Sequence, residues 1–307
     1  MYVSRIRIIA DPQNEVARSL SKSLEELGYF IVQEDPEVLV YFYPLGITVR
    51  KIIPFLKEKE TDPVVISITD DASYVIPVIK EHRGGSFIGG LISDLLGSQL
   101  ILTSRTSQMG LYSVEEFAWI NGLEVKSQDA DRLNVKLVKT GKIKIYQIDK
   151  IPIRWMEGFE SSDSLEDADA LIGENPDSHD KPVLLPRQVV VGLGYTSNTP
   201  PEVLIFSILN TMKSINIYER RLNFIAVPEI KQNDLNLQKV GRKVGASIIY
   251  VPMKELKGKG QSTTSRVAMD HFGVNGVCEP SLEVLGTKVV LKRTKRAYGV
   301  VSCLGVK

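Results

Sequence analysis

Strand-like and helix-like segments alternate through the first 125 residues of this chain, and this alternation constrains the fold more than any other feature. The apolar run from Arg5 to Ala10 predicts a strand, and the segment from Asn14 to Leu27 predicts a helix that ends at Gly28. Strands separated by helices usually pair in parallel, because each helix carries the chain back across the sheet. The sequence therefore predicts an α/β fold with mostly parallel sheets covered by helices.

Length and charge narrow the class of protein further. The chain has 307 residues, and single hydrophobic cores stop growing at about 250–300 residues, so several domains are expected. The net charge is +1, from 38 Lys and Arg against 37 Asp and Glu, which predicts no broad basic surface for nucleic acid.

The longest apolar stretches, such as residues 38–49, are too short to span a bilayer, and the first residues lack the pattern of a signal peptide. The two cysteines, Cys278 and Cys303, give no disulfide framework, so the sequence predicts a protein of the reducing cytoplasm.

Changes in composition and residue pattern along the sequence predict three domains. Residues 1–125 are expected to form an α/β domain, residues 126–187 a small α+β middle module, and residues 188–307 a second α/β domain. In the middle module, residues 135–155 predict a β-hairpin that turns at Thr140-Gly141.

An acidic segment in the middle module could suggest a metal loop. Its carboxylates are Asp163, Glu166, Asp167 and Asp169. They lack the spacing of a calcium loop, so a solvated acidic face is the better interpretation.

The segment from Val75 to Phe87 carries the densest functional signal. It predicts a buried strand, then Glu81-His82-Arg83, then a helix opened by Gly84-Gly85. Glycines at such a turn let a ligand approach the backbone, and the N–H groups of a first helical turn attract anions. Arginine is suited to binding a carboxylate, and histidine is the side-chain type that exchanges protons near neutral pH. The alternative is a structural turn with a packed histidine and an arginine paired with a neighbouring acid.

A second glycine-containing segment opens the third region. Residues 188–191 predict a strand, Gly192-Leu193-Gly194 a turn, and residues 203–212 a helix. The polar residues between them, Thr196, Ser197, Asn198 and Thr199, could hold an anionic group together with the N–H groups of the helix start. The third glycine of a dinucleotide-binding motif is missing and no P-loop is present, so nucleotide binding is disfavoured. A tight structural turn is the alternative.

Three further polar features lie towards the C-terminus. Residues 254–264 are interpreted as a flexible surface loop in preference to a lid over an acidic ligand. Glu279 is expected near the start of a short helix, either as a functional acid or as a cap. The basic turn at residues 292–296 lacks the aromatic residues of a nucleic-acid platform.

The remaining histidines and cysteines form no recognisable site. His179 and His271 are widely separated from His82 in the sequence, so no metal-ligand spacing is present. Cys278 lies beside Glu279, but no histidine is near it in the sequence, and a buried cysteine is the better interpretation than a nucleophile.

Two blocks of motifs occur in a distinctive order. The first has Gly-Ile-x-Val-Arg-x-Ile-x-Pro at residues 46–54, Lys-x-Lys-x-x-Asp-Pro at residues 57–63, and then His82-Arg83-Gly84-Gly85. The second block follows the order Gly-x-Gly, Lys-x-x-Asp, Ser-x-Val and Gly-x-x-x-Val-x-Glu. Its positions here are Gly192 and Gly194, Lys231 and Asp234, Ser265 and Val267, and Gly273, Val277 and Glu279. Together these blocks resemble the CbiG family of cobalamin biosynthesis over most of the chain.

Three sites depart from the pattern of that family. Ser86-Phe87 stands where the family usually has Ala-Asn, Ser107 follows Thr106 where it has Asp, and Tyr195 stands where it has a turn cysteine. If the family's side chains at these positions are needed for catalysis, this chain would be a non-catalytic protein that binds or carries a corrinoid intermediate. This is the alternative function.

The resemblance implies a cobalt-precorrin-5A hydrolase of the anaerobic route to vitamin B12. The family opens a lactone on the macrocycle and releases acetaldehyde, giving cobalt-precorrin-5B. Such chemistry needs a group to activate water, donors for an oxyanion and cations for the carboxylate arms.

The resemblance also implies roles for individual residues. His82 would be the base or acid, Arg83 with the Gly84 and Gly85 amides would hold a carboxylate or oxyanion, and residues 192–199 would form a second carboxylate cradle. Further candidates are Lys231 for substrate binding and Glu279 for catalysis. Cobalt would arrive inside the substrate, so no cofactor and no metal site of the protein are expected. The expected partners are this tetrapyrrole and other enzymes of the pathway, with no nucleic acid and no membrane.

Overall fold

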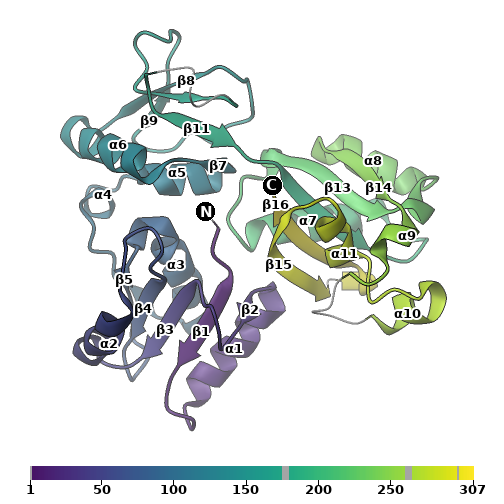
Figure 1. Ribbon diagram of the computed structural model, residues 1–307, viewed down its shortest axis with the longest axis horizontal. Helices are drawn as coiled ribbons and strands as arrows, with labels where there is room; N and C mark the ends of the chain where they lie inside the picture. The colour runs from purple at the N-terminus through teal and green to yellow at the C-terminus, as the bar shows by residue number, and fades with distance from the viewer. Residues whose placement is uncertain (1, 175–179, 260–264, 296) are drawn as a thin grey trace. The chain divides into compact units, whose positions relative to one another are not determined.

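The computed structural model describes residues 2–174, 180–259, 265–295 and 297–307. Over these ranges the strands form three sheets (Figure 1), and the chain divides into two compact units. The first unit contains residues 1–25 and 29–186, and the second contains residues 26–28 and 187–307. The predicted α/β class, with mostly parallel sheets and helices, is confirmed.

The first sheet has six strands in the order β2-β1-β3-β4-β5-β6. Their bounds are β1 Arg5–Ile9, β2 Phe30–Ile31, β3 Val38–Phe42, β4 Val64–Ile68, β5 Tyr74–Ile79 and β6 Gln99–Leu100. All neighbouring strands are parallel except β4 and β5. Every residue of β3 and β4 is buried, as expected for continuous apolar strands in the middle of a parallel sheet.

The helices of this sheet are α1 (Glu15–Leu27), α2 (Leu45–Ile52) and α3 (Gly85–Leu96). The sequence predicts that Pro54 interrupts a helix, and α2 indeed ends at Ile52, before the 3₁₀ turn η1 (Ile53–Phe55). The interruption follows because proline has no N–H to continue the helical ladder.

The second sheet has the order β7-β11-β10-β8-β9. Its strands are β7 Leu123–Glu124, β8 Ile143–Gln147, β9 Phe159–Ser161, β10 Ala170–Ile172 and β11 Val183–Pro186. Helix α4 (Arg105–Gln108) precedes this part of the chain, and α5 (Val114–Ile120) and α6 (Ser127–Thr140) contribute to its core. Thus α5 and β7 pack with the second sheet, although they precede residue 125, where the sequence predicts the end of the first domain.

The predicted hairpin at Thr140-Gly141 is wrong. Residues 127–140 form α6, which ends at Gly141, where the backbone is left-handed. Of the two strands expected for the hairpin, the first is therefore part of a helix and the second is β8. Ala130, Leu133 and Leu137 are the buried residues of this helix and recur at helical spacing. The branched residues between them suggested a strand, but burial of this face decides the structure.

The third sheet has the order β14-β13-β12-β16-β15. Its strands are β12 Val189–Gly194, β13 Leu222–Pro228, β14 Ser247–Val251, β15 Lys288–Lys295 and β16 Val301–Val306. The helices are α7 Pro201–Lys213, α8 Leu235–Val244, α9 Met253–Leu256, α10 Arg266–Phe272 and α11 Cys278–Val284. On β16, Ser302 bonds to Thr211 of α7 and Cys303 faces α11, because successive strand residues point to opposite faces.

The structure joins Cys278 of α11 to Cys303 of β16 in a disulfide, with their Cα atoms 6.0 Å apart. The expectation that the two cysteines are unlinked is therefore corrected: α11 packs across β12 and β16 and brings together residues that are 25 positions apart. His179 and residues 260–264 of the predicted loop at residues 254–264 lie outside the described residues, and residues 254–256 of that loop belong to α9. In the part of the chain that is described, no helix is long and apolar enough to cross a membrane.

Candidate active site

His82 lies in a short 3₁₀ turn, η2 (Glu81–Arg83), between β5 and α3. The turn is flanked by two residues with positive φ, Lys80 at 57° and Gly84 at 108°. A Cβ on Gly84 would approach Val3 Cγ2 to 2.9 Å, so both conformation and space require glycine. The predicted opening of a helix by Gly84 and Gly85 is confirmed.

Gly85 has an internal role. Its N–H donates to the carbonyl of Lys80 at 3.1 Å, and a Cβ there would lie 2.8 Å from the same oxygen. The amide of Gly85 is therefore not a free donor, which corrects its predicted role in holding an anion.

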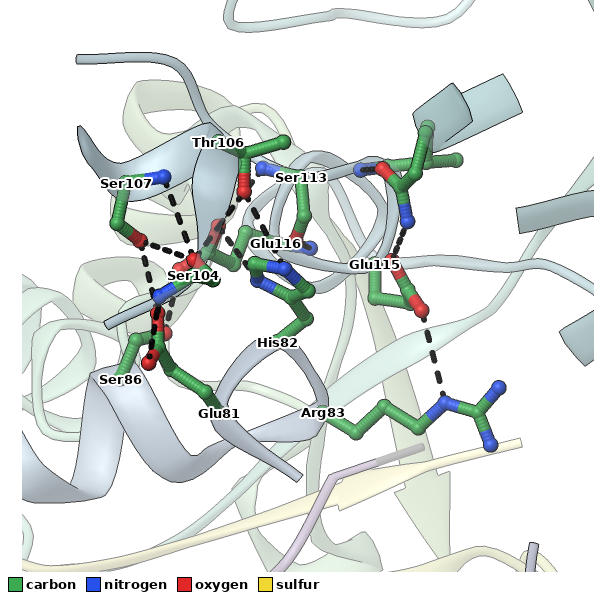
Figure 2. A network of polar contacts seen from close by, with 12 residues as sticks. Glu81, His82, Arg83, Ser86, Ser104, Thr106, Ser107, Ser113, Glu115 and Glu116 are labelled. Atoms are coloured by element: carbon green, nitrogen blue, oxygen red, sulfur yellow. Dashed lines mark hydrogen bonds and ion pairs between the residues drawn. The ribbon is translucent and has the colours of Figure 1, made fainter. Parts of the chain in front are cut away.

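Both nitrogens of the His82 ring face oxygen atoms from other elements (Figure 2). Nε2 lies 3.2 Å from Thr106 Oγ1 on α4, and Nδ1 lies 3.9 Å from Glu116 Oε2 on α5. The His82 side chain is 25% exposed, so the ring is held by the protein while part of it stays accessible.

Glu116 is fixed by the start of α5. The sequence predicts a capping box from Ser113 and Glu116, and this is confirmed: Glu116 N–H donates to Ser113 Oγ, and Ser113 N–H donates to Glu116 Oε2 at 2.7 Å. Ser86 Oγ donates to the other oxygen of the carboxylate. The helix cap thus also determines which carboxylate faces His82.

Arg83 points away from His82 to Glu115, the residue before Glu116 (Figure 2). Arg83 Nε lies 3.5 Å from Glu115 Oε1, and Glu115 Oε2 accepts a hydrogen bond from Asn134 at 2.7 Å. Among the described residues, the buried Nη2 of Arg83 has no hydrogen-bond partner. This nitrogen is a donor that a carboxylate or oxyanion could use.

Glu81 anchors the loop before α4. Its carboxylate accepts the N–H groups of Thr103 and Ser104 and the hydroxyls of Thr103 and Ser107. Burial raises the pKa of Glu81, but these hydrogen bonds outweigh burial and the net pKa is lowered. Glu81 is therefore a stable anion that accepts hydrogen bonds.

A cavity of about 570 Å³ lies beside this cluster in the first unit. His82, Arg83, Glu115 and Trp119 are among the residues that line it. Its volume is within the range of about 300–1,000 Å³ that is usual for small-molecule sites. The cluster thus has a place for a ligand at its side.

In the second unit, Gly192 and Gly194 lie within strand β12 and are buried, so the predicted turn at these residues is corrected. A Cβ on Gly192 would approach the Cys278 carbonyl oxygen to 2.7 Å, and one on Gly194 would approach Val277 Cγ2 to the same distance. The glycines let α11 lie close to the strand. Packing explains them without a ligand.

Lys231 lies in a 3₁₀ turn, η5 (Glu229–Lys231), directly after β13. It is only 9% exposed, its ammonium group lies 4.3 Å from the centre of the Tyr195 ring, and it reaches Ser197 Oγ at 3.5 Å. Burial lowers the pKa of Lys231, and the nearby Asp234 partly offsets this effect. The structure therefore brings together Lys231 and Ser197, two of the residues that the sequence predicts for substrate binding.

Asp234 is occupied by other donors. Oδ1 caps α8 by accepting the N–H groups of Asn236 and Leu237, and Oδ2 accepts the Tyr195 hydroxyl at 2.8 Å. Burial, and then the bond to Asp234, raise the pKa of Tyr195, so its hydroxyl remains a donor.

The other predicted residues of this unit have distinct environments. Thr196 and Ser197 are exposed in the loop after β12, whereas Thr199 is buried and donates to the Thr196 carbonyl. Glu279 is the second residue of α11, only 2% exposed, and its Oε1 accepts the Arg293 N–H at 2.7 Å. This contact ties α11 to β15 and gives Glu279 a structural role.

Each departure from the expected family pattern makes a local contact. Ser86 donates to Glu116, Phe87 packs against Trp119 with ring centres 5.5 Å apart, and Ser107 donates to Glu81 at 2.9 Å. Tyr195 donates to Asp234, as described above. These side chains are therefore part of the same polar and aromatic clusters as the predicted site.

Sequence reasoning missed Glu81, Ser104, Thr106 and Glu115 as site residues. Glu116 was identified only as a helix cap. No local sequence pattern relates these residues to His82, because they become neighbours of His82 only in the folded chain. The Ser113–Glu116 capping box was the one pattern that predicted the position of a carboxylate on α5. Within the described ranges, no group of three or more His, Cys, Asp or Glu residues is arranged to hold a metal ion.

Fold and site together define a class: a multi-domain α/β protein with a histidine and an arginine at the wall of a ligand-sized cavity. Family models described as Cobalamin synthesis G N-terminal and Cobalamin synthesis G C-terminus match residues 32–107 and 189–303. The chain belongs to the CbiG family, as the sequence motifs predict.

Named relatives agree with this membership. The chain is 25% identical over 298 residues to the cobalt-precorrin-5A hydrolase of Salmonella typhimurium, covering 87% of this chain and 81% of the relative. It is 22% identical over 286 residues to the enzyme of the same name from Priestia megaterium, covering 86% and 76% of the two chains. A crystal structure of a cobalamin biosynthesis protein G homolog from Sulfolobus solfataricus has a TM-score of 0.62 at 18% identity, covering 99% of this chain and 98% of the homolog. The last similarity supports the fold.

Proposed function

We propose that this protein is a cobalt-precorrin-5A hydrolase of anaerobic cobalamin biosynthesis, which opens the substrate lactone and releases acetaldehyde to give cobalt-precorrin-5B. The observation that carries the proposal is His82, held between Thr106 and Glu116 at the wall of a cavity that Arg83 also lines. Membership of the CbiG family and the names of the relatives support the same activity.

His82 and Arg83 divide the work of lactone opening in this proposal. Water adds to the lactone carbonyl and the ring oxygen leaves, so a proton must be moved and negative charge on oxygen must be stabilised. His82 moves the proton. Arg83 offers Nη2 to the developing oxyanion or to a carboxylate arm of the macrocycle.

The second unit contributes substrate binding. Within this unit, Lys231 and the exposed hydroxyls of Thr196 and Ser197 form a cradle for a carboxylate group. Cobalt is carried by the substrate, and the protein needs no cofactor of its own. We place the reaction in the cytoplasm with the other enzymes of the pathway on the ground of family membership alone, because the Cys278–Cys303 disulfide removes the argument from unlinked cysteines.

The test is anaerobic incubation of the purified protein with enzymatically made cobalt-precorrin-5A, followed by trapping of acetaldehyde and recording of the pigment spectrum. Acetaldehyde is expected to appear in step with loss of the lactone. His82→Gln should lower kcat by about 100-fold or more, because a positioned acid or base contributes about 10²–10⁴-fold. A spectral shift on mixing without acetaldehyde would refute hydrolysis. Undiminished turnover in a folded His82→Gln variant would remove the role of His82.

A further inference from the structure

A chain of hydroxyl groups connects Glu81 to His82 (Figure 2). Ser107 Oγ donates to the Glu81 carboxylate at 2.9 Å. A hydroxyl has one proton to donate, so Ser107 can only accept from its other neighbour, Ser104 Oγ, at 2.8 Å. The direction of the hydrogen bonds is thereby fixed as far as Ser104.

The same reasoning extends to the ring. The Ser104 proton is already used, so at the 3.3 Å contact between Ser104 Oγ and Thr106 Oγ1 the threonine must donate. Thr106 Oγ1 then has only lone pairs to offer His82 Nε2, which lies 3.2 Å away. The chain therefore favours a proton on Nε2.

The other ring nitrogen faces a carboxylate. Nδ1 is buried, has no hydrogen-bond partner among the described residues, and lies 3.9 Å from Glu116 Oε2. A bare nitrogen lone pair would be repelled by this carboxylate, whereas an N–H group would be attracted to it. Glu116 cannot easily turn away, because Ser113 and Ser86 hold its two oxygens.

The other charged groups of η2 and α5 are directed to partners other than the His82 ring. On η2, Glu81 is at the far end of the hydroxyl chain and Arg83 is directed to Glu115. On α5, Glu115 faces Arg83 and Glu116 faces His82. Glu116 is thus the carboxylate that acts directly on the ring.

From these contacts we infer that His82 is held as an imidazolium by Thr106 and Glu116 and enters the reaction as a proton donor. Thr106 and Glu116 are positioning residues, which act through His82. The inference rests on the proposed function and decides between its two options for His82, base and acid. In lactone opening the Nε2–H bond of the ring breaks, because Nδ1 is buried, and the proton goes to the lactone ring oxygen as its bond to the carbonyl carbon breaks. The attacking water adds its OH to that carbon and gives its other proton to the neutral ring.

Nitrogen NMR of the ¹⁵N-histidine-labelled protein at neutral pH tests the inference without substrate. The chain has three histidines, so His82→Gln assigns the signals of His82. In the wild type both ring nitrogens should have the chemical shift of a protonated nitrogen. Glu116→Gln retains the capping box, because glutamine also serves at this position, and should give a neutral ring with its proton on Nε2.

Variants of Thr106 should give the opposite tautomer to Glu116→Gln, and they also supply the control. Thr106→Val removes the acceptor at Nε2 with little change in volume and should give a neutral ring with its proton on Nδ1. Thr106→Ser should restore the wild-type signals. Turnover should fall about tenfold or more in Glu116→Gln and Thr106→Val with KM unchanged, and Thr106→Ser should recover it.

An unprotonated ring nitrogen in the wild type, or the same tautomer in both Glu116→Gln and Thr106→Val, would overturn the inference. The two readouts separate it from the proposed function. Imidazolium signals without acetaldehyde release would refute the function alone, and acetaldehyde release by a protein with a neutral His82 would refute the inference alone.

Discussion

The His82 cluster of the first unit and the Lys231 cluster of the second unit handle charge differently. In the first, a basic side chain faces each carboxylate: His82 faces Glu116, and Arg83 faces Glu115. In the second, Lys231 is buried beside an aromatic ring and a hydroxyl, and no carboxylate within 4.0 Å pairs with it among the described residues.

The nearest acid explains the difference. Both oxygens of Asp234 accept hydrogen bonds, one from Tyr195 and the other from the start of α8, so the carboxylate is held by these donors. A buried charge without a partner is costly, and a ligand of opposite charge removes that cost. The comparison teaches that the first cluster is suited to moving a proton, and the second to receiving an anion.

The largest effect is expected at the glycines of β12. Variants there distinguish a role in packing from a role in binding in the second unit. Gly192→Ala should lower the free energy of unfolding by about 3 kcal/mol, because the new methyl group must displace α11. Ser197→Ala, in the exposed loop after the same strand, should leave unfolding unchanged and raise KM. Denaturant titration and steady-state kinetics of both variants check this. A stable Gly192→Ala protein with an altered KM would instead make the glycine part of the binding site.

Lys231→Met should distinguish an anion site from a structural lysine. Because burial lowers the pKa of Lys231, folding disfavours its charged form. This cost is present in full at pH values below the lowered pKa, falls as the pH rises through it, and is gone above the pKa of the unfolded chain. The variant should therefore be at least as stable as the wild type, while KM rises about tenfold, or about 1.4 kcal/mol. The exposed Lys239→Met on α8 is the matched control. A destabilised Lys231→Met protein with normal KM would contradict the comparison.

Glu81→Gln should give the smallest effect and should depend on pH. The pKa of Glu81 is lowered in the folded protein, so its contribution to stability is present above the pKa of the unfolded chain and is lost as the pH falls through the folded value. At neutral pH the variant should lose about 1 kcal/mol, as is usual for hydrogen bonds to a charged group that is partly exposed. Denaturant titrations from neutral to acid pH should show the free energies of unfolding of the wild type and Glu81→Gln becoming equal. The exposed Glu26→Gln should match the wild type throughout, and a constant gap between wild type and Glu81→Gln would show that charge is not the cause.

The parts of the fold and site that the sequence predicted are those fixed by short-range patterns. The alternation of strands and helices, the glycine turn after His82 and the Ser113–Glu116 cap each depend on neighbouring residues. The α6 helix was missed because branched residues suggested strands, and burial of one face prevailed. The contacts of His82 could not be predicted, since Thr106 and Glu116 reach it only through tertiary packing.

Glu116 serves the α5 cap and the His82 ring with one carboxylate, and this sharing limits how the position can vary among related chains. Glutamine satisfies a helix start as well as glutamate does, so selection for folding alone would accept it. Selection for the charge that faces the ring would reject it. A glutamine at this position would therefore mark a chain that keeps the fold but turns its substrate over more slowly.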